Sequence, residues 1–403
     1  MGRLRQLTAG ESHGEALIGI LDGLVRGIPV SDAAIASQLK RRRVGYGRST
    51  RQSQESDRFR IIGGVRQGMS TGNPFGILLE NDSSSPAPET LKSTSRKQSK
   101  SALTKDMCCP RSGHADFVGM LRWGETEAVD VAERASARET AVLVALAVPA
   151  RELLAQLGVL LGGMVTRMGS IEAQIDATAS VSDLLRRTAK TGDVWMTPDS
   201  VVVPRWREVV DEARHDGDTL GGAIRVLVDG LIPGLGGFSQ RWQRIDGRLS
   251  AGLMALPGVK AVSIGRALET SRSRGSACCD EMRYSDSTGV RRLTNWAGGL
   301  EGGMTNGEPL VIELLMKPIP TGKGRMSVNV KTLRRSAAAC PRHDTIALAA
   351  LAVIAESVVA IELADAYLEL LGGTTLEDVK AARKRYLARL RPLWLPKRSS
   401  RRS

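Results

Sequence analysis

The stretch from Asn295 to Thr321 has the sequence NWAGGLEGGMTNGEPLVIELLMKPIPT and combines a glycine-rich loop with a strand. Five of residues 298–307 are glycines, which can adopt positive φ and leave backbone N–H groups open to an anion or a ring. Residues 310–316 have the length and β-rich composition of a strand, and prolines fix the chain after Lys317. The stretch predicts a ligand-binding loop and a lysine held at a strand end. The alternative is a glycine-rich hairpin that only connects two strands.

Composition and charge limit the class of protein. With 403 residues, of which 42% are hydrophobic and 3% aromatic, the chain can bury a large core that depends on aliphatic side chains. The net charge is +14, but residues 380–403 carry ten Lys or Arg and no acid, which leaves +4 for residues 1–379. We therefore expect a basic C-terminal tail at 380–403, and binding of nucleic acid is not favoured. Residues 82–106, which are serine-rich and basic, predict a disordered insertion.

Cysteine spacing and hydropathy exclude several kinds of protein. The five cysteines form two adjacent pairs and one single residue, so we expect reduced thiols and no bound metal. The N-terminal residues lack the apolar core of a signal peptide. The longest apolar run, 345–371, is interrupted by acids such as Glu356 and predicts a buried helix, with Asp344 as its N-cap, and not a membrane span. These features predict a cytoplasmic protein.

Two histidines stand in segments where an imidazole can face a cleft. His13 lies in Gly10-Glu-Ser-His-Gly14, a tight turn after a predicted strand. Simple solvent exposure is the alternative for a single histidine in a turn. His114 lies two residues before Asp116 and close to Arg111. Because histidine titrates near neutral pH, both are candidates for proton transfer.

A run of basic residues ends the first predicted helix. Ser31 is the predicted N-cap, and the helix ends in Lys40-Arg-Arg-Arg43, which includes Arg42. Arg48 follows in a loop that contains two glycines. Guanidinium groups spread over such a loop suit bidentate binding of carboxylate and phosphate groups. A solvated charge run at a helix C-terminus is the alternative.

The segment Glu133-Arg-Ala-Ser-Ala-Arg-Glu-Thr140 opens a long predicted helix. Ser136 as N-cap, with Glu139 three residues later, predicts a capping box. That motif explains neither Arg134 nor Arg138, which put positive charge where the helix dipole is already positive. We therefore expect an anion bound at this helix start.

Seven motifs, taken together, resemble those of the chorismate synthase family. They are Gly-Glu-Ser-His-Gly, Arg-Arg-Arg-x-Gly-x-Gly-Arg, Gly-His-Ala-Asp, Glu-Arg-Ala-Ser-Ala-Arg-Glu-Thr, Asn-x-Ala-Gly-Gly-Leu-Glu-Gly-Gly, Lys-Pro-Ile-Pro-Thr and Arg-His-Asp. The resemblance covers about residues 3–373. It implies a single α+β domain over residues 1–379, in which a layer of helices is sandwiched between antiparallel β-sheets, and a homotetrameric assembly.

The resemblance also implies an enzyme, a carbon–oxygen lyase of the shikimate pathway that serves aromatic amino acid biosynthesis. Its substrate would be 5-enolpyruvylshikimate 3-phosphate, converted to chorismate by 1,4-anti elimination of phosphate with reduced FMN as cofactor. This substrate carries two carboxylates and a phosphate, which suits the gathered arginines. Two histidines that titrate near neutral pH suit the proton transfers.

Residue roles follow from the matching motif positions. His13 would protonate the departing phosphate, His114 would keep the reduced flavin in its useful protonation state, and Asp344 would assist the proton step at the flavin N5 atom. The arginines that would bind substrate or NADP are Arg42, Arg48, Arg111 and Arg138. The implied flavin contacts are Arg134, Ala135, Ser136, Pro257, Gly258, Gly302, Lys317, Pro318, Ile319, Pro320, Thr321 and Arg342.

The chain departs from the family pattern at positions near the implied flavin contacts. Pro257-Gly258 replaces Asn-Ala or Gln-Ala, Gly265-Arg266 begins an altered Gly-x-Gly-Phe motif, and Cys279 replaces a histidine. The first alternative to an active enzyme is therefore a family member that has lost flavin binding and turnover. The second is a polyanion-binding protein that acts through its basic tail. Flavin affinity tests the first alternative, and salt-dependent binding tests the second.

Overall fold

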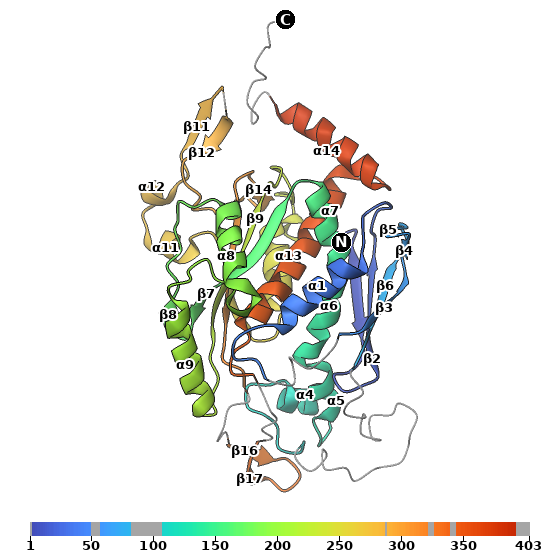
Figure 1. Ribbon diagram of the computed structural model, residues 1–403, viewed down its shortest axis with the longest axis vertical. Coiled ribbons are helices and arrows are strands. Elements are labelled where there is room, and N and C mark those ends of the chain that lie inside the picture. Colours follow the sequence, from blue (N-terminus) through green and yellow to red (C-terminus); the bar gives the residue numbers. More distant parts are fainter. Residues whose placement is uncertain are drawn as a thin grey trace, which may run out of the picture.

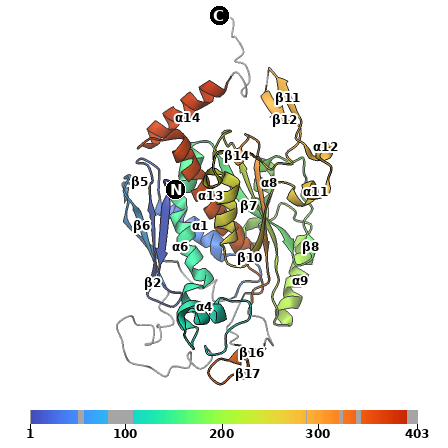
Figure 2. The same ribbon diagram turned by 180° about the vertical axis from the view of Figure 1, so that it is seen from behind.

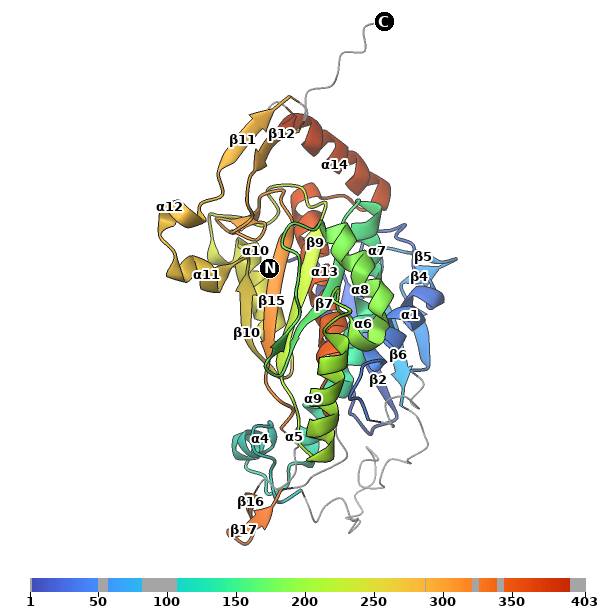
Figure 3. The ribbon, with the colours of Figure 1, turned by 60° about the vertical axis from the view of Figure 1, so that its left-hand side comes forward.

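Two antiparallel sheets flank a central layer of helices in the computed structural model (Figure 1; Figure 3). The structure describes residues 2–49, 57–81, 107–286, 288–320, 326–338 and 344–391. Helix α6 (Thr140–Leu146) packs against the first sheet, and α13 (Leu348–Leu371) packs against the second. The predicted α+β fold, with helices sandwiched between antiparallel sheets, is confirmed.

The first sheet has the strand order β1-β2-β6-β3. Its strands are β1 (Arg5–Ala9), β2 (Ala16–Asp22), β6 (Phe75–Glu80) and β3 (Phe59–Gly63). Successive side chains of a strand face opposite sides of a sheet, so in β2 Leu17 and Leu21 are buried, whereas Ile18 and Ile20 are exposed on the outer face. The turn that joins the ends of β1 and β2 carries the Gly-Glu-Ser-His-Gly motif.

The second sheet has the strand order β10-β15-β9-β7-β8. Its strands are β10 (Val259–Ile264), β15 (Leu310–Met316), β9 (Gly222–Asp229), β7 (Leu160–Met168) and β8 (Ile171–Glu172). β15 pairs with β9 from Leu310 opposite Val228 to Met316 opposite Gly222. At about 3.4 Å per residue, the ends of this strand lie about 20 Å apart. The predicted strand is confirmed, and Lys317 follows its C-terminal end.

The glycine-rich stretch before β15 forms a short hairpin of β13 (Leu300–Glu301) and β14 (Met304–Thr305). Its turn consists of Gly302 and Gly303, with φ of +60° and +89°. A side chain on Gly303 would approach Gly237 O to 2.7 Å, so only glycine fits this close contact. The strand-connecting hairpin, which was the alternative for this stretch, therefore describes residues 300–305.

The other elements surround these layers. The helices are α1 (Asp32–Arg43), α4 (Asp116–Trp123), α5 (Val129–Arg134), η2 (Ala137–Glu139), α7 (Val148–Gln156), α8 (Val181–Trp195), α9 (Val203–His215), η3 (Arg241–Gln243), α10 (Ile245–Met254), α11 (Ala267–Arg272), α12 (Gly275–Cys278) and α14 (Leu376–Leu390). The short strands are β4 (Val65–Arg66), β5 (Met69–Ser70), β11 (Met282–Ser285), β12 (Gly289–Arg292), β16 (Met326–Asn329) and β17 (Arg334–Ala337). Within the described ranges, every helix is too short or too polar to cross a membrane.

Helix α13 passes through the centre of the molecule and is buried along most of its length (Figure 2). A helix that is apolar on all sides is typical of a protein core. Its Glu356 carboxylate is fully buried and is paired with Arg41 of α1 and Arg151 of α7, both at 2.8 Å. Burial alone would raise the pKa of Glu356, but the two arginines outweigh burial and lower it. The buried charge therefore ties three helices together.

Local capping was predicted correctly at one helix start and wrongly at another. Ser31 caps α1 and accepts from Ala34 N, as expected. Ser136 caps only the short η2, and the predicted capping box is wrong because the Glu139 carboxylate instead accepts from Thr8 Oγ1 at 2.9 Å. The predicted long helix is divided into η2, α6 and α7. The contact of Glu139 with Thr8 of β1 has therefore replaced the predicted contact within the helix start.

Two predicted segments lie wholly or partly outside the described residues. Residues 82–106, the predicted insertion, are outside them, as are residues 392–403. The predicted tail begins at residue 380, but α14 spans Leu376–Leu390 and therefore includes its first eleven residues. The basic segment thus begins as most of helix α14.

Candidate active site

His13 lies in the turn between β1 and β2 and is bound by one buried carboxylate. Glu133, near the end of α5, accepts from His13 Nδ1 and from the His13 backbone N–H, both at 2.8 Å. The Glu133 side chain is 8% exposed, whereas that of His13 is 39% exposed. Burial alone would raise the pKa of Glu133, but the hydrogen bonds from His13 outweigh it, and the pKa is lowered. The imidazole is accessible while the carboxylate beneath it stays ionised.

His114 has a second carboxylate partner, Asp116, which it shares with an arginine. His114 Nδ1 is hydrogen-bonded to Asp116 Oδ1, and Arg111 donates to the same carboxylate from Nε at 2.7 Å and from Nη2 at 2.9 Å. Asp116 is the first residue of α4 and is almost fully buried. Burial would raise the pKa of Asp116, but the hydrogen bonds from His114 and Arg111 hold it well below its usual range.

Arg111 connects the two histidine–carboxylate pairs. Its Nη2 is 3.2 Å from His114 Nδ1. Its positive charge also helps to lower the pKa of Glu133, so the His13 pair lies within its electrostatic reach. Helix α4, which begins at Asp116, packs against α5, which carries Glu133, so the two histidine–carboxylate pairs lie on neighbouring elements.

The end of β15 reaches the His114 segment. Lys317 Nζ donates to the carbonyl oxygen of Gly113 at 2.6 Å, directly before His114. Lys317 N donates to Gly258 O at 3.0 Å, which places the Pro257-Gly258 turn alongside. The structure thus brings the predicted flavin-binding segment 317–320 next to His114, and the segment 257–258 next to Lys317.

The segment Arg134-Ala135-Ser136 lies against the turn that carries His13. The Arg134 guanidinium donates to Thr8 Oγ1 at 2.7 Å, and most of the side chain is exposed. Ser136 Oγ donates to Ser12 Oγ at 3.1 Å. Three further predicted flavin contacts are therefore neighbours of His13.

Two of the predicted substrate arginines are held by groups of the chain itself. Arg42 is buried and donates to Thr140 Oγ1 at 3.0 Å and to Ala137 O at 2.8 Å. Arg138 is paired with the buried carboxylate of Asp57 at 2.5 Å. The sequence predicts a bound anion at this helix start, and the Asp57 carboxylate of the chain itself pairs with Arg138 there. These contacts hold η2 next to α1, and substrate binding by either arginine stays a prediction.

Asp344 and Arg48 form an ion pair, and the prediction of Asp344 as a helix N-cap is wrong. Arg48 Nη1 donates to Asp344 Oδ2 at 2.7 Å, and Ser49 N donates to Asp344 Oδ1 at 2.7 Å. Helix α13 begins later, with Ala347 as its N-cap. The Asp344 carboxylate is instead fully used by the Arg48 guanidinium and the Ser49 N–H, so it does not reach the helix start. Two predicted site residues from separate motifs therefore meet.

Gly302 lies at the opposite end of β15 from Lys317. Its hairpin adjoins the start of the strand, where Val311 N donates to Gly298 O at 3.1 Å. Figure 1 accordingly shows β14 in the upper part of the molecule and α4 in the lower part. Within one chain, Gly302 is not brought together with the histidine pairs. Thr321 and Arg342 lie outside the described residues.

Sequence reasoning missed Glu133 and Ser12 as site residues. Both stand in motifs that carry other candidates, and Ser12 directly precedes His13. Position in a motif was the only available signal, since Glu133 is 120 residues from its partner His13.

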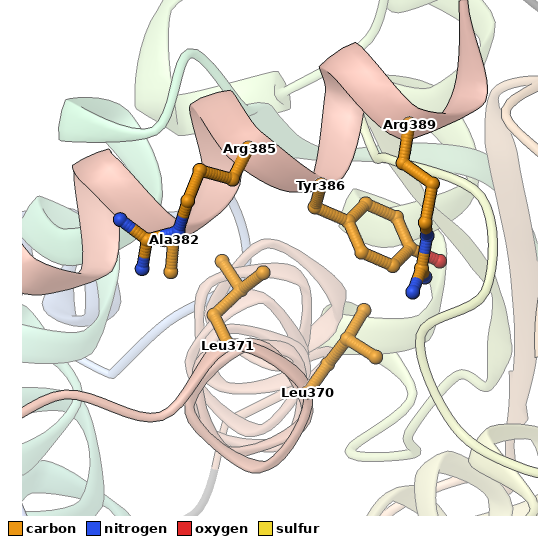
Figure 4. A pocket seen from close by; sticks show the side chains of 6 residues that line it. All are labelled: Leu370, Leu371, Ala382, Arg385, Tyr386 and Arg389. Carbon is orange, nitrogen blue, oxygen red and sulfur yellow. The ribbon is translucent and has the colours of Figure 1, made fainter.

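A pocket of about 240 Å³ between the end of α13 and α14 lies elsewhere in the molecule (Figure 4). It is lined by Leu370, Leu371, Ala382, Arg385, Tyr386 and Arg389. It contains none of the predicted site residues and is smaller than the roughly 300–1,000 Å³ of typical ligand pockets. Among the residues with described positions, no cluster of His, Cys, Asp and Glu suits a metal ion.

The fold and this site define a class of protein, an α+β protein in which two histidine–carboxylate pairs lie near cationic side chains. Two carboxylate-bound histidines share the site with cationic side chains, among them Arg134 and Lys317. The chain belongs to the chorismate synthase family, whose family model matches residues 4–368.

Individual relatives agree with this assignment. The chorismate synthase of Desulforudis audaxviator is 42% identical over 96% of this chain and 98% of the relative. That of Symbiobacterium thermophilum is 41% identical over 96% of this chain and 99% of the relative. A solved crystal structure of chorismate synthase matches with a TM-score of 0.77 at 31% identity, over 97% of this chain and 99% of that chain. These similarities support chorismate synthase function.

Proposed function

We propose that this chain converts 5-enolpyruvylshikimate 3-phosphate to chorismate by 1,4-anti elimination of phosphate. The observation that carries the proposal is that His13 and His114, each on its own buried carboxylate, share one site. An elimination that releases phosphate and removes a ring proton needs groups that hold and donate protons near neutral pH. Histidine is the side chain best suited to that task.

We assign His13 to the departing phosphate. Glu133 accepts from Nδ1, so Nε2 is the ring nitrogen that takes up a second proton, and the side chain is 39% exposed. A proton on Nε2 would neutralise charge on the phosphate as its bond to the ring breaks. Arg111, which lies between the two pairs, is the arginine best placed to bind an anionic substrate near both histidines.

We assign reduced FMN to the part of the site that Lys317 lines beside His114 and that Arg134 and Ser136 line beside the His13 turn, and these residues fit this cofactor. Lys317 and Arg134 supply cationic donors for a phosphate, and Ser136 supplies a hydroxyl for polar ring atoms. Gly258, with φ of +82°, leaves the backbone bare beside Lys317. Reduced FMN supplies transient electron donation that assists loss of the phosphate and of the ring proton.

Asp344 is proposed to act in proton transfer on the flavin, with Arg48 holding its carboxylate. The 2.7 Å ion pair between them fixes the orientation of both side chains. Arg42, Arg48, Arg111 and Arg138 together are proposed to create the positive field that attracts the substrate or NADP. Arg138 contributes less to this field than Arg42, because the Asp57 carboxylate neutralises it, whereas the groups of Thr140 and Ala137 that Arg42 binds are uncharged.

We further propose a homotetramer that works in the cytoplasm. Gly302 supports an assembly, because it and Lys317 lie at opposite ends of β15, a strand about 20 Å long, so Gly302 could join the flavin site only if a second copy supplies it. The outer face of the first sheet also exposes Leu7, Ile18 and Ile20, which an assembly would cover. Light scattering of the purified chain measures the number of copies.

Anaerobic turnover with chemically reduced FMN tests the proposed activity. We expect equal amounts of chorismate and inorganic phosphate from the full-length chain, and strongly reduced release of both from His13→Ala. Titration with oxidised and reduced FMN is the accompanying measurement. If no form of FMN binds and no product forms, the chain is a family member that has lost its activity.

A further inference from the structure

Both oxygen atoms of the Glu133 carboxylate bind His13. Oε1 accepts from His13 Nδ1 and Oε2 accepts from the His13 backbone N–H, both at 2.8 Å. These two bonds fix the imidazole ring relative to its own backbone, because rotation about the side-chain bonds would break one of them. The Glu133 side chain is 8% exposed, so water competes little for either bond.

The chemistry of this contact determines which ring nitrogen carries the proton. An ionised carboxylate only accepts hydrogen bonds, so His13 Nδ1 must be protonated. Burial alone would raise the pKa of Glu133, yet its hydrogen bonds from His13 lower it, so the carboxylate is ionised at neutral pH. In the neutral imidazole, Nε2 is then the basic nitrogen, and a second proton there gives the imidazolium.

Other charged groups lie around the turn that carries His13. Glu11, in the same turn as His13, has a raised pKa because it is partly buried and close to Glu133 and Asp130. This group of acids is countered from the other side by Arg111, whose charge acts on Glu133. Arg134, which binds Thr8 of β1 and Gly10 of the same turn, is a further positive group, so the direct contact with the Glu133 carboxylate is what stabilises a cation at His13.

We propose that Glu133 is a positioning residue that fixes the Nδ1-protonated form of His13 and stabilises its imidazolium, so that His13 is the proton donor of the site. The assignment of a donor rests on the proposed function, but the effect of Glu133 on His13 does not. Asp116 cannot act equally on His114, because it also binds Arg111 through two hydrogen bonds.

Nuclear magnetic resonance of the full-length chain tests this without substrate or flavin. With ring-labelled histidine, four residues contribute signals, and His13→Asn assigns that of His13. In the unsubstituted chain we expect the nitrogen and carbon shifts of neutral His13 to report a proton on Nδ1. A proton on Nε2 would overturn the proposal, and this measurement needs no variant at position 133.

Glu133→Gln is the second arm of the experiment. A glutamine has one acceptor oxygen and no charge, so we expect the midpoint of the His13 titration to fall by about one pH unit, a tenfold loss of proton affinity. Glu139→Gln is the matched control, since Glu139 binds Thr8 and not a histidine, and it should leave the midpoint unchanged. An unchanged midpoint in Glu133→Gln would overturn the proposal.

Activity then tests the role of His13 as proton donor separately from the role of Glu133 as positioning residue. If His13 donates the proton, kcat of the flavin-loaded Glu133→Gln enzyme should begin to fall at a pH about one unit lower than in the unsubstituted enzyme. A shifted titration with an unshifted pH profile would keep Glu133 as the positioning residue and remove His13 from the donor role.

Discussion

The two histidines of the site differ in what their carboxylates bind. Glu133 gives both oxygens to His13, whereas Asp116 divides its oxygens between His114 and Arg111. A carboxylate already paired with a guanidinium stabilises a neighbouring imidazolium less, because the arginine charge opposes a second positive charge. Two pairs of the same composition therefore differ in how their carboxylates are shared. A pattern of residue types does not distinguish them.

Removing either imidazole should give the largest effect. We expect His13→Ala and His114→Ala each to lower turnover about 10²- to 10⁴-fold, the usual contribution of a positioned acid or base. Thermal unfolding should hardly change, since neither ring belongs to the hydrophobic core. The comparison is sharpened by flavin affinity, which only His114→Ala should weaken. Equal loss of flavin binding in both variants would contradict the division of roles.

The two carboxylates should differ in their contribution to stability. Asp116→Asn leaves the largely buried Arg111 without its ion-pair partner, and we expect a loss of about 2–3 kcal/mol in the free energy of unfolding. Glu133→Gln retains one acceptor and should lose about 1 kcal/mol. Urea denaturation of both variants measures the difference. Equal losses would show that Arg111 gains little from Asp116.

Acid should weaken the Arg111–Asp116–His114 cluster. The pKa of Asp116 lies below its value in an unfolded chain, about 3.9, so the ionised group stabilises the fold above that pH. This contribution is lost as the pH falls from about 4 towards the lower folded pKa. Asp116→Asn should therefore flatten the fall of the unfolding free energy below pH 4. A slope equal to that of the unsubstituted chain would assign acid sensitivity to other carboxylates.

The smallest effect is expected at Gly258, which adjoins only the His114 side of the site. Its φ is +82°, and a side chain there would lie 3.3 Å from Met316 Cε, so Gly258→Ala should cost about 1 kcal/mol of stability. Because Gly258 O holds Lys317 N, flavin binding should weaken a few-fold while the His13 titration stays unchanged. Calorimetry and the histidine titration measure these effects. Tighter flavin binding would contradict the expectation.

Much of the fold follows from local pattern. β2 was predictable because its side chains alternate between buried and exposed positions. α13 was predictable because its largely apolar sequence is too long for a strand and contains too many acidic residues for a membrane span. The errors lie where distant contacts replace local ones. Asp344 meets Arg48 across 296 residues instead of capping a helix, and Glu139 meets Thr8 across 131 residues.

The site was predictable only in part. His13 and His114 stand in recognisable motifs, and Asp116 is near enough in sequence to be paired with His114. Glu133 could not be paired with His13, because only the packing of α5 beneath the β1–β2 turn brings them together. The separation of Gly302 from Lys317 likewise depends on the length of a paired strand, which motif order does not reveal.

The central position of α13 has a consequence for synthesis of the protein. Its residues are translated roughly 15–50 seconds after those of the first sheet, at about 5–20 residues per second. Until then Arg41 and Arg151 lack their shared partner Glu356, and the inner surfaces of α1, α7 and β7 lack their cover. The growing chain therefore emerges from the ribosome with a partly open core, and protection by chaperones during that interval should determine its yield.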